Sequence, residues 1–230
     1  MAQIKANEAL VKALQTWNID HLYGIPGDSV DAVVDSLRTV RDQFKFYHVR
    51  HEEVASLAAA SYTKMTGKIG VALSIGGPGI VHLLNGMYDA KMDNVPQLII
   101  AGQTNSTLLG TKFFQETNIS KMVDDVAVYH HQIQKGDNVF EITNEAIRTA
   151  YEKKGVSVII CPNDLLTQKI KDTTNRAVDT TKPKPASPKF KSIKKAAKLI
   201  DKAKKPVMLI GLGTQHAKDE LRSEERRVGK

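Results

Sequence analysis

One carboxylate, Glu52, combines the position and the neighbours that acid–base chemistry needs. It follows closely on the apolar segment 44–49, which predicts a strand, and it opens the segment 52–65, whose small residues predict a helix. Open α/β sheets bind ligands at the carboxyl ends of their strands, so Glu52 is placed to contact a bound molecule. The structural alternative is that Glu52 only stabilises the first turn of the helix, where a negative charge is favourable.

Two glycine-rich turns, 24–27 and 76–79, flank this carboxylate in the sequence, and each follows an apolar run. Glycine lets a turn bring its backbone close to a bound ring. We therefore expect three strand ends to converge on one cofactor pocket. The residues of these turns that could lie next to such a pocket are Pro26, Gly27, Gly77 and Pro78. The alternative is that both segments are plain turns, with a proline at the first position of a helix.

Strand and helix patterns alternate over the first 165 residues. The predicted helices are 6–17, 28–37, 52–65, 80–91 and 141–153, and the predicted strands are 21–23, 44–49, 69–75, 97–101, 127–133 and 156–161. The nearly continuous apolar runs 98–100 and 156–160 are typical of a parallel sheet that is covered on both faces. The predicted fold class is therefore α/β, a doubly wound parallel sheet with helices on both faces.

The pattern predicts a first domain over residues 1–165. Residues 166–188 are polar and rich in proline, and they are expected to be a linker. Residues 189–221 are expected to be the truncated start of a second α/β domain. Its expected elements are a helix, a strand and a glycine turn: 189–203, 206–210 and 211–213. Residues 222–230 are almost wholly polar and charged, and they are expected to be a non-native or disordered tail.

The composition, with 41% hydrophobic and 25% charged residues, is that of an ordinary globular protein. The net charge is +8, but residues 168–205 hold twelve Lys and one Arg against three Asp, a net +10, which leaves −2 for the rest. This excess is expected to be a solvated face. No nucleic-acid partner is predicted, because no stacking or zinc-knuckle motif accompanies the charge. The single cysteine, Cys161, ends an apolar run and is typical of a buried thiol in the reducing cytoplasm.

Four short motifs stand in order at the ends of the predicted elements. They are Tyr23-Gly24-Ile25-Pro26-Gly27, Arg50-His51-Glu52-Glu53, Gly77-Pro78-Gly79 with Asn85-Gly86, and Phe114-Gln115-Glu116. In this combination the chain resembles, over about residues 3–221, the thiamine-diphosphate enzymes of the acetolactate synthase and pyruvate oxidase family. Within that family it is most similar to bacterial pyruvate oxidases of the acetate-forming type, which pass electrons to a quinone.

The resemblance implies that the first domain binds the aminopyrimidine of thiamine diphosphate, the pyrimidine domain of the family. Glu52 matches the family glutamate that hydrogen-bonds the pyrimidine ring nitrogen. Asn85 matches a polar residue that faces the same ring. Phe114 and Gln115 match a loop that reaches the reacting centre, which makes them candidate catalytic residues beside Glu52.

The resemblance also implies two further cofactors, FAD and Mg²⁺. Gly211 and Gly213 match a turn that touches FAD in the family, although His216 replaces the third glycine of the usual dinucleotide fingerprint. The family's Gly-Asp-Gly metal motif does not occur in this sequence, so the Mg²⁺ ligands are expected in a C-terminal domain. No metal ligand is predicted in this chain, and His51 has no evident partner for such a role.

For the full-length protein, the resemblance implies oxidative decarboxylation of pyruvate to acetate or acetyl phosphate and CO₂, with electrons passing to FAD and then to quinone or O₂. It also implies a homo-oligomer, a dimer or tetramer with active sites between subunits, in the cytoplasm or peripheral at the inner face of the membrane. The chain by itself is expected to be inactive. Two alternatives stay open: an acetolactate synthase, which joins two pyruvates, and a non-catalytic cofactor-binding or interaction module.

Overall fold

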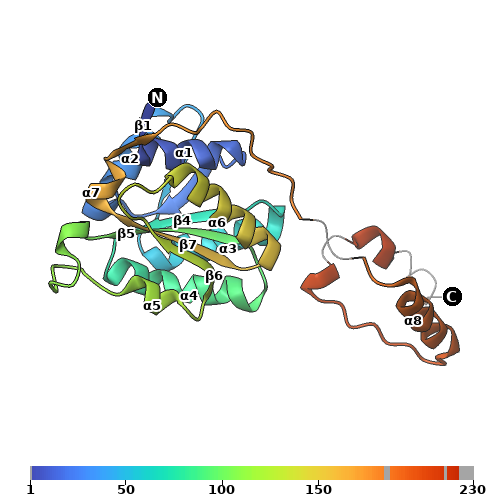
Figure 1. The fold of residues 1–230 in the computed structure, drawn as a ribbon. Helices are drawn as coiled ribbons and strands as arrows, with labels where there is room; N and C mark the ends of the chain where they lie inside the picture. Colours follow the sequence, from blue (N-terminus) through green and yellow to red (C-terminus); the bar gives the residue numbers. More distant parts are fainter. Residues whose placement is uncertain (1, 184–186, 215–216, 223–230) are drawn as a thin grey trace. The chain divides into compact units, whose positions relative to one another are not determined.

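The computed structural model describes residues 2–183, 187–214 and 217–222. The chain divides into two compact units, Met1–Pro183 and Lys184–Lys230. The first unit carries the central sheet and the helices that cover it (Figure 1). The second carries one long helix. No helix among the described residues has the length and apolar character needed to cross a membrane.

Six parallel strands form the sheet of the first unit, in the order β3-β2-β4-β5-β7-β6. Every residue of β5 and β7 is buried, as expected for strands with helices on both sides. The predicted fold class is thus confirmed. The strands are β2 (His21–Gly24), β3 (Lys45–His48), β4 (Gly70–Ser74), β5 (Gln97–Gln103), β6 (Ala127–Gln132) and β7 (Val156–Pro162).

Helices cover both faces of this sheet, and side chains of β5 alternate between the two cores (Figure 1). Leu98 and Ile100 pack with α1 (Ala6–Thr16), α2 (Asp31–Thr39) and α6 (Val139–Lys153). Ile99 and Ala101 pack with α3 (Glu52–Thr66), α4 (Pro78–Met92) and α5 (Ile119–Val123). Full burial of a leucine or isoleucine side chain contributes about 1.5–3 kcal/mol, so these two cores hold the strand ends in place.

Helix boundaries near the predicted pocket follow from glycine and proline. α3 ends where Gly67 adopts a left-handed conformation, with φ of 68°. α4 begins at Pro78, two residues before the predicted start, because proline suits the first helical position. Before α2 the chain forms a short 3₁₀ turn, η1 (Asp28–Val30). After β5 the chain forms a second such turn, η2 (Ser106–Leu108).

The first unit continues past the predicted boundary at residue 165. After the short helix α7 (Asn163–Leu166), β8 (Lys169–Lys171) pairs antiparallel with β1 (Gln3–Lys5). Ile4 and Ile170 face each other in this pair, and both are buried. Residues 169–171 therefore belong to a small second sheet and not to a linker.

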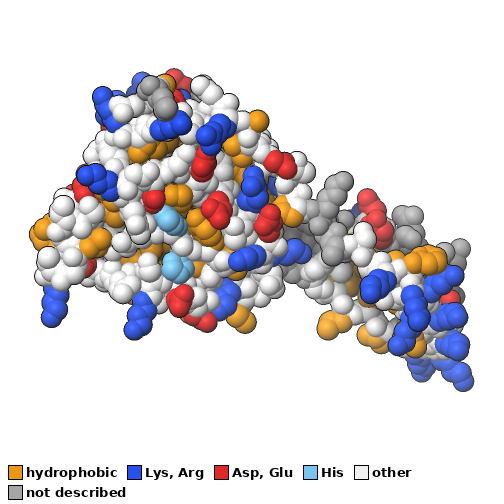
Figure 2. Space-filling view, in the orientation of Figure 1, with side chains coloured by type: hydrophobic (Ala, Val, Ile, Leu, Met, Phe, Trp, Pro, Cys, Tyr) orange, Lys and Arg blue, Asp and Glu red, His pale blue; other side chains and the backbone are white. Residues whose placement is uncertain are grey.

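The second unit contains α8 (Phe190–Lys202), close to the predicted helix, and the 3₁₀ turn η3 (Leu212–Thr214). Figure 2 shows Lys and Arg side chains gathered on this unit, as the local charge excess predicts. The strand predicted at 206–210 is wrong: these residues have no regular structure, and Val207 and Leu209 are almost fully exposed. A strand forms only with a neighbouring strand, and none pairs with this segment in the described part of the chain. Of the predicted tail, 223–230 lie outside the described residues.

Candidate functional site at the carboxyl ends of three strands

Three neighbouring strands, β3, β2 and β4, end at the same edge of the sheet. Glu52 follows β3, the 24–27 turn follows β2, and the 76–79 turn follows β4. The backbone amide of Val49 donates to the Gly24 carbonyl at 3.1 Å, which ties the first two strand ends together. The chain runs from β2 outward to β3 and then crosses to β4, so the strand order reverses between β2 and β4. Such reversal points are where open α/β sheets bind ligands.

The two glycine turns lie in direct contact. A Cβ on Gly27 would lie 2.6 Å from Cγ2 of Ile75, so a side chain at this position would collide with the second turn. The backbone amide of Gly76 donates to Oγ of Ser29 at 3.1 Å. Pro26 is exposed at the tip of the first turn. The structure thus places Gly27 against Ile75, the residue that leads into the second turn.

The loop that carries Phe114 and Gln115 packs on the second turn. Gly77 has φ of 60°, and a Cβ there would lie 2.8 Å from the carbonyl oxygen of Gln115 and 3.0 Å from its Cα. Gln115 itself has φ of 62°. Phe114 is 77% exposed. Both loop residues line a cavity of about 210 Å³ together with Ser29 and Gly76.

Glu52 lies in the first turn of α3 and is largely buried, with 14% of its side chain exposed. Its Oε2 lies 2.9 Å from Nδ1 of His82, which projects from the second turn of α4. α3 and α4 can approach this closely because of Gly86: a Cβ there would lie 2.5 Å from the backbone nitrogen of Leu57. The sequence analysis missed His82. Its spacing could have indicated it: His82 precedes Gly86 by four residues, so both lie on the same face of α4.

Asn85 has a partner within the chain that the sequence analysis did not assign. Its Nδ2 donates to Oε1 of Glu53 at 2.6 Å, across the same pair of helices. His51 stacks on His82 with ring centroids 4.4 Å apart and an interplanar angle of 28°. Nδ1 of His51 lies 3.8 Å from Oε2 of Glu53. Two carboxylates, two imidazoles and one amide therefore form a connected cluster over the start of α3.

Glu116 is a second residue that sequence reasoning did not single out for a role of its own. It accepts the backbone amides of Gly110 and Phe113, at 2.5 and 3.1 Å. The amide of Gly110 is the main cause that lowers the pKa of Glu116, and the amide of Phe113 adds to it. The carboxylate thereby fixes the loop that presents Phe114 and Gln115.

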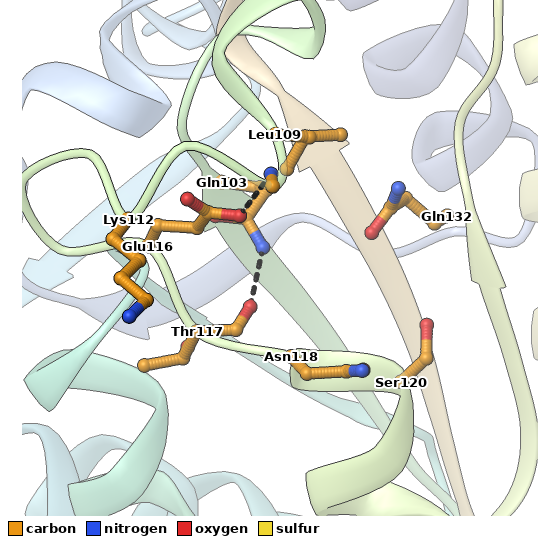
Figure 3. Close-up of a pocket in the computed structure, with 9 residues that line it drawn as sticks. Gln103, Leu109, Lys112, Glu116, Thr117, Asn118, Ser120 and Gln132 are labelled. Atoms are coloured by element: carbon orange, nitrogen blue, oxygen red, sulfur yellow. Dashed lines mark hydrogen bonds between the residues drawn. The ribbon is translucent and has the colours of Figure 1, made fainter.

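A larger cavity of about 570 Å³ is lined by another part of this loop (Figure 3). Gln103, at the end of β5, lines this cavity as well as the smaller one and donates through Nε2 to the Thr117 carbonyl at 2.9 Å. None of the residues predicted for the site lines the larger cavity. Of the residues predicted for the site, Phe114 and Gln115 line the smaller cavity, and Glu52 lines neither of the two.

The predicted flavin turn, with Gly211 and Gly213, lies in the second unit. A Cβ at either glycine would meet no described atom within 4 Å, and no strand leads into the turn. The flavin contact at these two glycines therefore stays a prediction.

The donor set at the strand ends fits one end of thiamine diphosphate. An aminopyrimidine ring needs a carboxylate for its ring nitrogen and close backbone approach to its faces and edges, and Glu52 and the paired glycine turns supply these features. The site holds no comparable group of oxygen ligands for Mg²⁺ among the residues selected above.

Comparison with known proteins agrees with this geometry. The family model for the thiamine pyrophosphate enzyme N-terminal TPP binding domain matches residues 4–122. A Bacillus subtilis protein, described as thiamine pyrophosphate-containing, is 47% identical over 221 residues, 96% of this chain and 38% of the relative. A pyruvate oxidase of Lactiplantibacillus plantarum is 39% identical over 220 residues, 95% of this chain and 36% of the relative. An acetolactate synthase of Mycobacterium leprae is 33% identical over 213 residues, 92% of this chain and 34% of the relative.

The chain thus spans little more than a third of the length of these relatives. The part that it covers includes the N-terminal cofactor-binding domain, and the resemblance given by the four motifs is confirmed. On the family match over residues 4–122, the chain belongs to the thiamine pyrophosphate enzyme family.

Proposed function

We propose that the full-length protein is a pyruvate oxidase that depends on thiamine diphosphate. The observation that carries this proposal is the placement of Glu52: it lies at the carboxyl end of β3, it is largely buried, and its Oε2 is engaged by His82. A carboxylate that served only to stabilise the helix terminus could do so while fully exposed to water. Burial against a histidine instead suits a group that exchanges a proton with a ligand.

The residues of this chain would bind and orient the aminopyrimidine. When bound, thiamine diphosphate supplies the carbon acid whose deprotonated form attacks the keto carbon of pyruvate. Glu52 would hold a proton at the pyrimidine ring nitrogen through Oε1, because Oε2 faces His82. The backbone at Gly27 and Gly77 would limit the space around the ring, and Gln115 would orient the substrate from the opposing loop.

Pyruvate oxidase is preferred over acetolactate synthase because of the relatives. The pyruvate oxidase of L. plantarum shares 39% identity with the chain, against 33% for the acetolactate synthase of M. leprae. The two reactions differ in what accepts the two-carbon unit, and that choice depends on parts of the relatives that the chain does not cover. Acetolactate synthase therefore stays the second candidate.

The remaining features of the proposal concern the whole protein. FAD and Mg²⁺ would be held outside the described residues, and electrons would pass to quinone or O₂. A dimer or tetramer with active sites between subunits is supported by exposed apolar side chains on α3 and α4, the helices that carry Glu52 and His82: Val54, Leu57, Val81 and Tyr88. A cytoplasmic location, with peripheral contact to the inner face of the membrane, suits a chain with a single, buried cysteine and a quinone acceptor.

The deciding experiment uses the full-length form with pyruvate, thiamine diphosphate, FAD and Mg²⁺. Reduction of a quinone or an artificial dye, with one CO₂ released per pyruvate, is the expected result. Formation of acetolactate without dye reduction would assign the protein to the second candidate. Absence of both activities, in a preparation shown by calorimetry to bind thiamine diphosphate, would leave the cofactor-binding module as the better description.

A further inference from the structure

His51, Glu52 and His82 form a cluster of three metal-binding side chains that the proposed chemistry uses only in part. One ligand atom from each residue lies within 4.8 Å of the other two. The sequence separates His82 from the other two residues by 30 positions, and the packing of α4 on α3 brings it to them. The structure therefore supplies the partners that the sequence did not show for His51.

We propose that these three side chains bind a divalent transition-metal cation, with Zn²⁺ as the reference ion. Two imidazole nitrogens and one carboxylate oxygen are the donor set of many zinc sites that keep an open position for water. Mg²⁺ prefers oxygen ligands, so this site is chemically distinct from the Mg²⁺ that the family resemblance implies.

The distances allow such a site after small side-chain movements. Ligand atoms around a tetrahedral zinc lie about 3.3 Å apart, since zinc–nitrogen and zinc–oxygen bonds are about 2.0–2.2 Å long. Nδ1 of His82 and Oε2 of Glu52 are already 2.9 Å apart. The His51 nitrogen must approach by at most about 1.5 Å, from within 4.8 Å to about 3.3 Å, and its side chain is 48% exposed, which leaves it free to rotate.

The surroundings favour a cation at this place. Glu53 adds a second carboxylate 3.8 Å from Nδ1 of His51, and Asn85 orients it through the 2.6 Å hydrogen bond to Oε1. A carboxylate behind a ligating histidine fixes the ring and raises its basicity. His82 is 43% exposed, so an ion can enter from solvent. Cys161 is fully buried and does not compete for added zinc.

Occupation of this site would oppose binding of the aminopyrimidine, because zinc on Oε2 draws negative charge away from Oε1, the oxygen proposed to hold the pyrimidine proton. This consequence rests on the proposed function, whereas zinc binding itself does not. Zinc would then act as an inhibitor that competes with thiamine diphosphate. The two ideas can be tested separately, since zinc binding is measured on the chain without any cofactor.

The test is a calorimetric titration of the tag-free 230-residue chain with Zn²⁺, repeated with Co²⁺ and followed by visible absorption. We expect one saturable site and the absorption bands of cobalt bound by nitrogen and oxygen. His82→Asn and His51→Asn should each weaken binding by about tenfold or more. The matched control is His130→Asn, since His130 is also partly exposed and lies 3.5 Å from a carboxylate oxygen of Asp124.

Three results would overturn the proposal: no saturable site in the unaltered chain, unchanged affinity in His82→Asn, or equal loss in His130→Asn. Circular dichroism of each variant guards against unfolding. His51 and His82 are both about half exposed, so we expect the fold to tolerate their replacement. Should His82→Asn unfold, Glu52→Gln provides the alternative variant, and retained zinc affinity there would equally refute the site.

Discussion

Nδ1 of His82 lies 2.9 Å from Oε2 of Glu52, across the contact between α3 and α4. This contact joins the helix that follows β3 to the helix that follows β4, so it couples two of the three strand ends at the site. It also holds one oxygen of the carboxylate, Oε2, in place. The orientation of Glu52 thus depends on how closely the two helices pack, which Gly86 permits.

Glu52→Gln in the full-length protein should lower turnover by about 10²-fold or more, because the amide cannot exchange a proton with the pyrimidine ring. The fold should be retained, since glutamine keeps the size and the hydrogen-bonding capacity of the side chain. Steady-state kinetics with pyruvate measures the effect.

Glu8→Gln is the matched control for this variant. Glu8 is also an acidic residue in the first turn of a helix, α1, and it is exposed. If Glu52 served only the helix terminus, the two variants would show the same small loss of stability and no loss of turnover. That outcome would remove Glu52 from the mechanism.

Local patterns were enough to predict the order of the six strands of the main sheet and of the five longer helices that cover it. The apolar run 156–160 and the helix stop at Gly67 depend only on residues nearby in the sequence. In the structure, the run lies in β7 and α3 ends at Gly67, as predicted. The strand expected at 206–210 failed because a strand needs a partner, which local sequence does not reveal. The three-residue strands β1 and β8 are too short for alternation to be recognised.

The candidate site likewise contains residues that local sequence identifies and residues that only the folded structure identifies. Glu52 and the glycine turns stand at ends of elements, where their neighbours in sequence identify them. His82 becomes visible only through the packing of two helices, 30 residues away from Glu52 in the chain. Glu116 is likewise defined by the folded loop, whose backbone amides point at its carboxylate.

Gly77→Ala should destabilise the first unit by about 2–3 kcal/mol. Its φ of 60° is unfavourable for alanine, and the added Cβ would lie within 3.0 Å of the Gln115 backbone. Gly110→Ala separates these two causes: its φ is 84°, but nothing lies within 4 Å of its Cβ, so only about 1 kcal/mol should be lost. Urea unfolding measures both. Equal losses would show that the loop does not rest on Gly77.

Glu116→Gln should loosen the loop that presents Phe114 at neutral pH and have no effect in acid. Backbone amides, that of Gly110 first, lower the pKa of Glu116 below the ordinary value of 4.5. A carboxyl group with a lowered pKa contributes stability above its unfolded-state pKa and loses it as the pH falls through the folded-state pKa. Limited proteolysis at the exposed loop, compared at neutral and acidic pH, should show faster cleavage of the variant only at neutral pH.

An equal cleavage rate at neutral pH would contradict the role given to Glu116. Glu152→Gln is a suitable control, because Glu152 is exposed near the end of α6, away from this loop. Its replacement should leave cleavage unchanged at both pH values.

Ile170→Ala should cost about 2 kcal/mol, because it removes a buried side chain that faces Ile4 across the β1–β8 pair. The loss belongs to the first unit only if residues 169–171 are part of it, as the pairing shows. Val81→Ala is the control: Val81 is 47% exposed on α4, so this variant should lose less than about 0.5 kcal/mol of stability.

A chain ending at residue 165 should be destabilised still further than Ile170→Ala, because it lacks β8 altogether and leaves Ile4 uncovered. Unfolding of this shorter chain at the same urea concentration as a chain ending at 183 would mean that the boundary at 165 was correct and that β8 is dispensable.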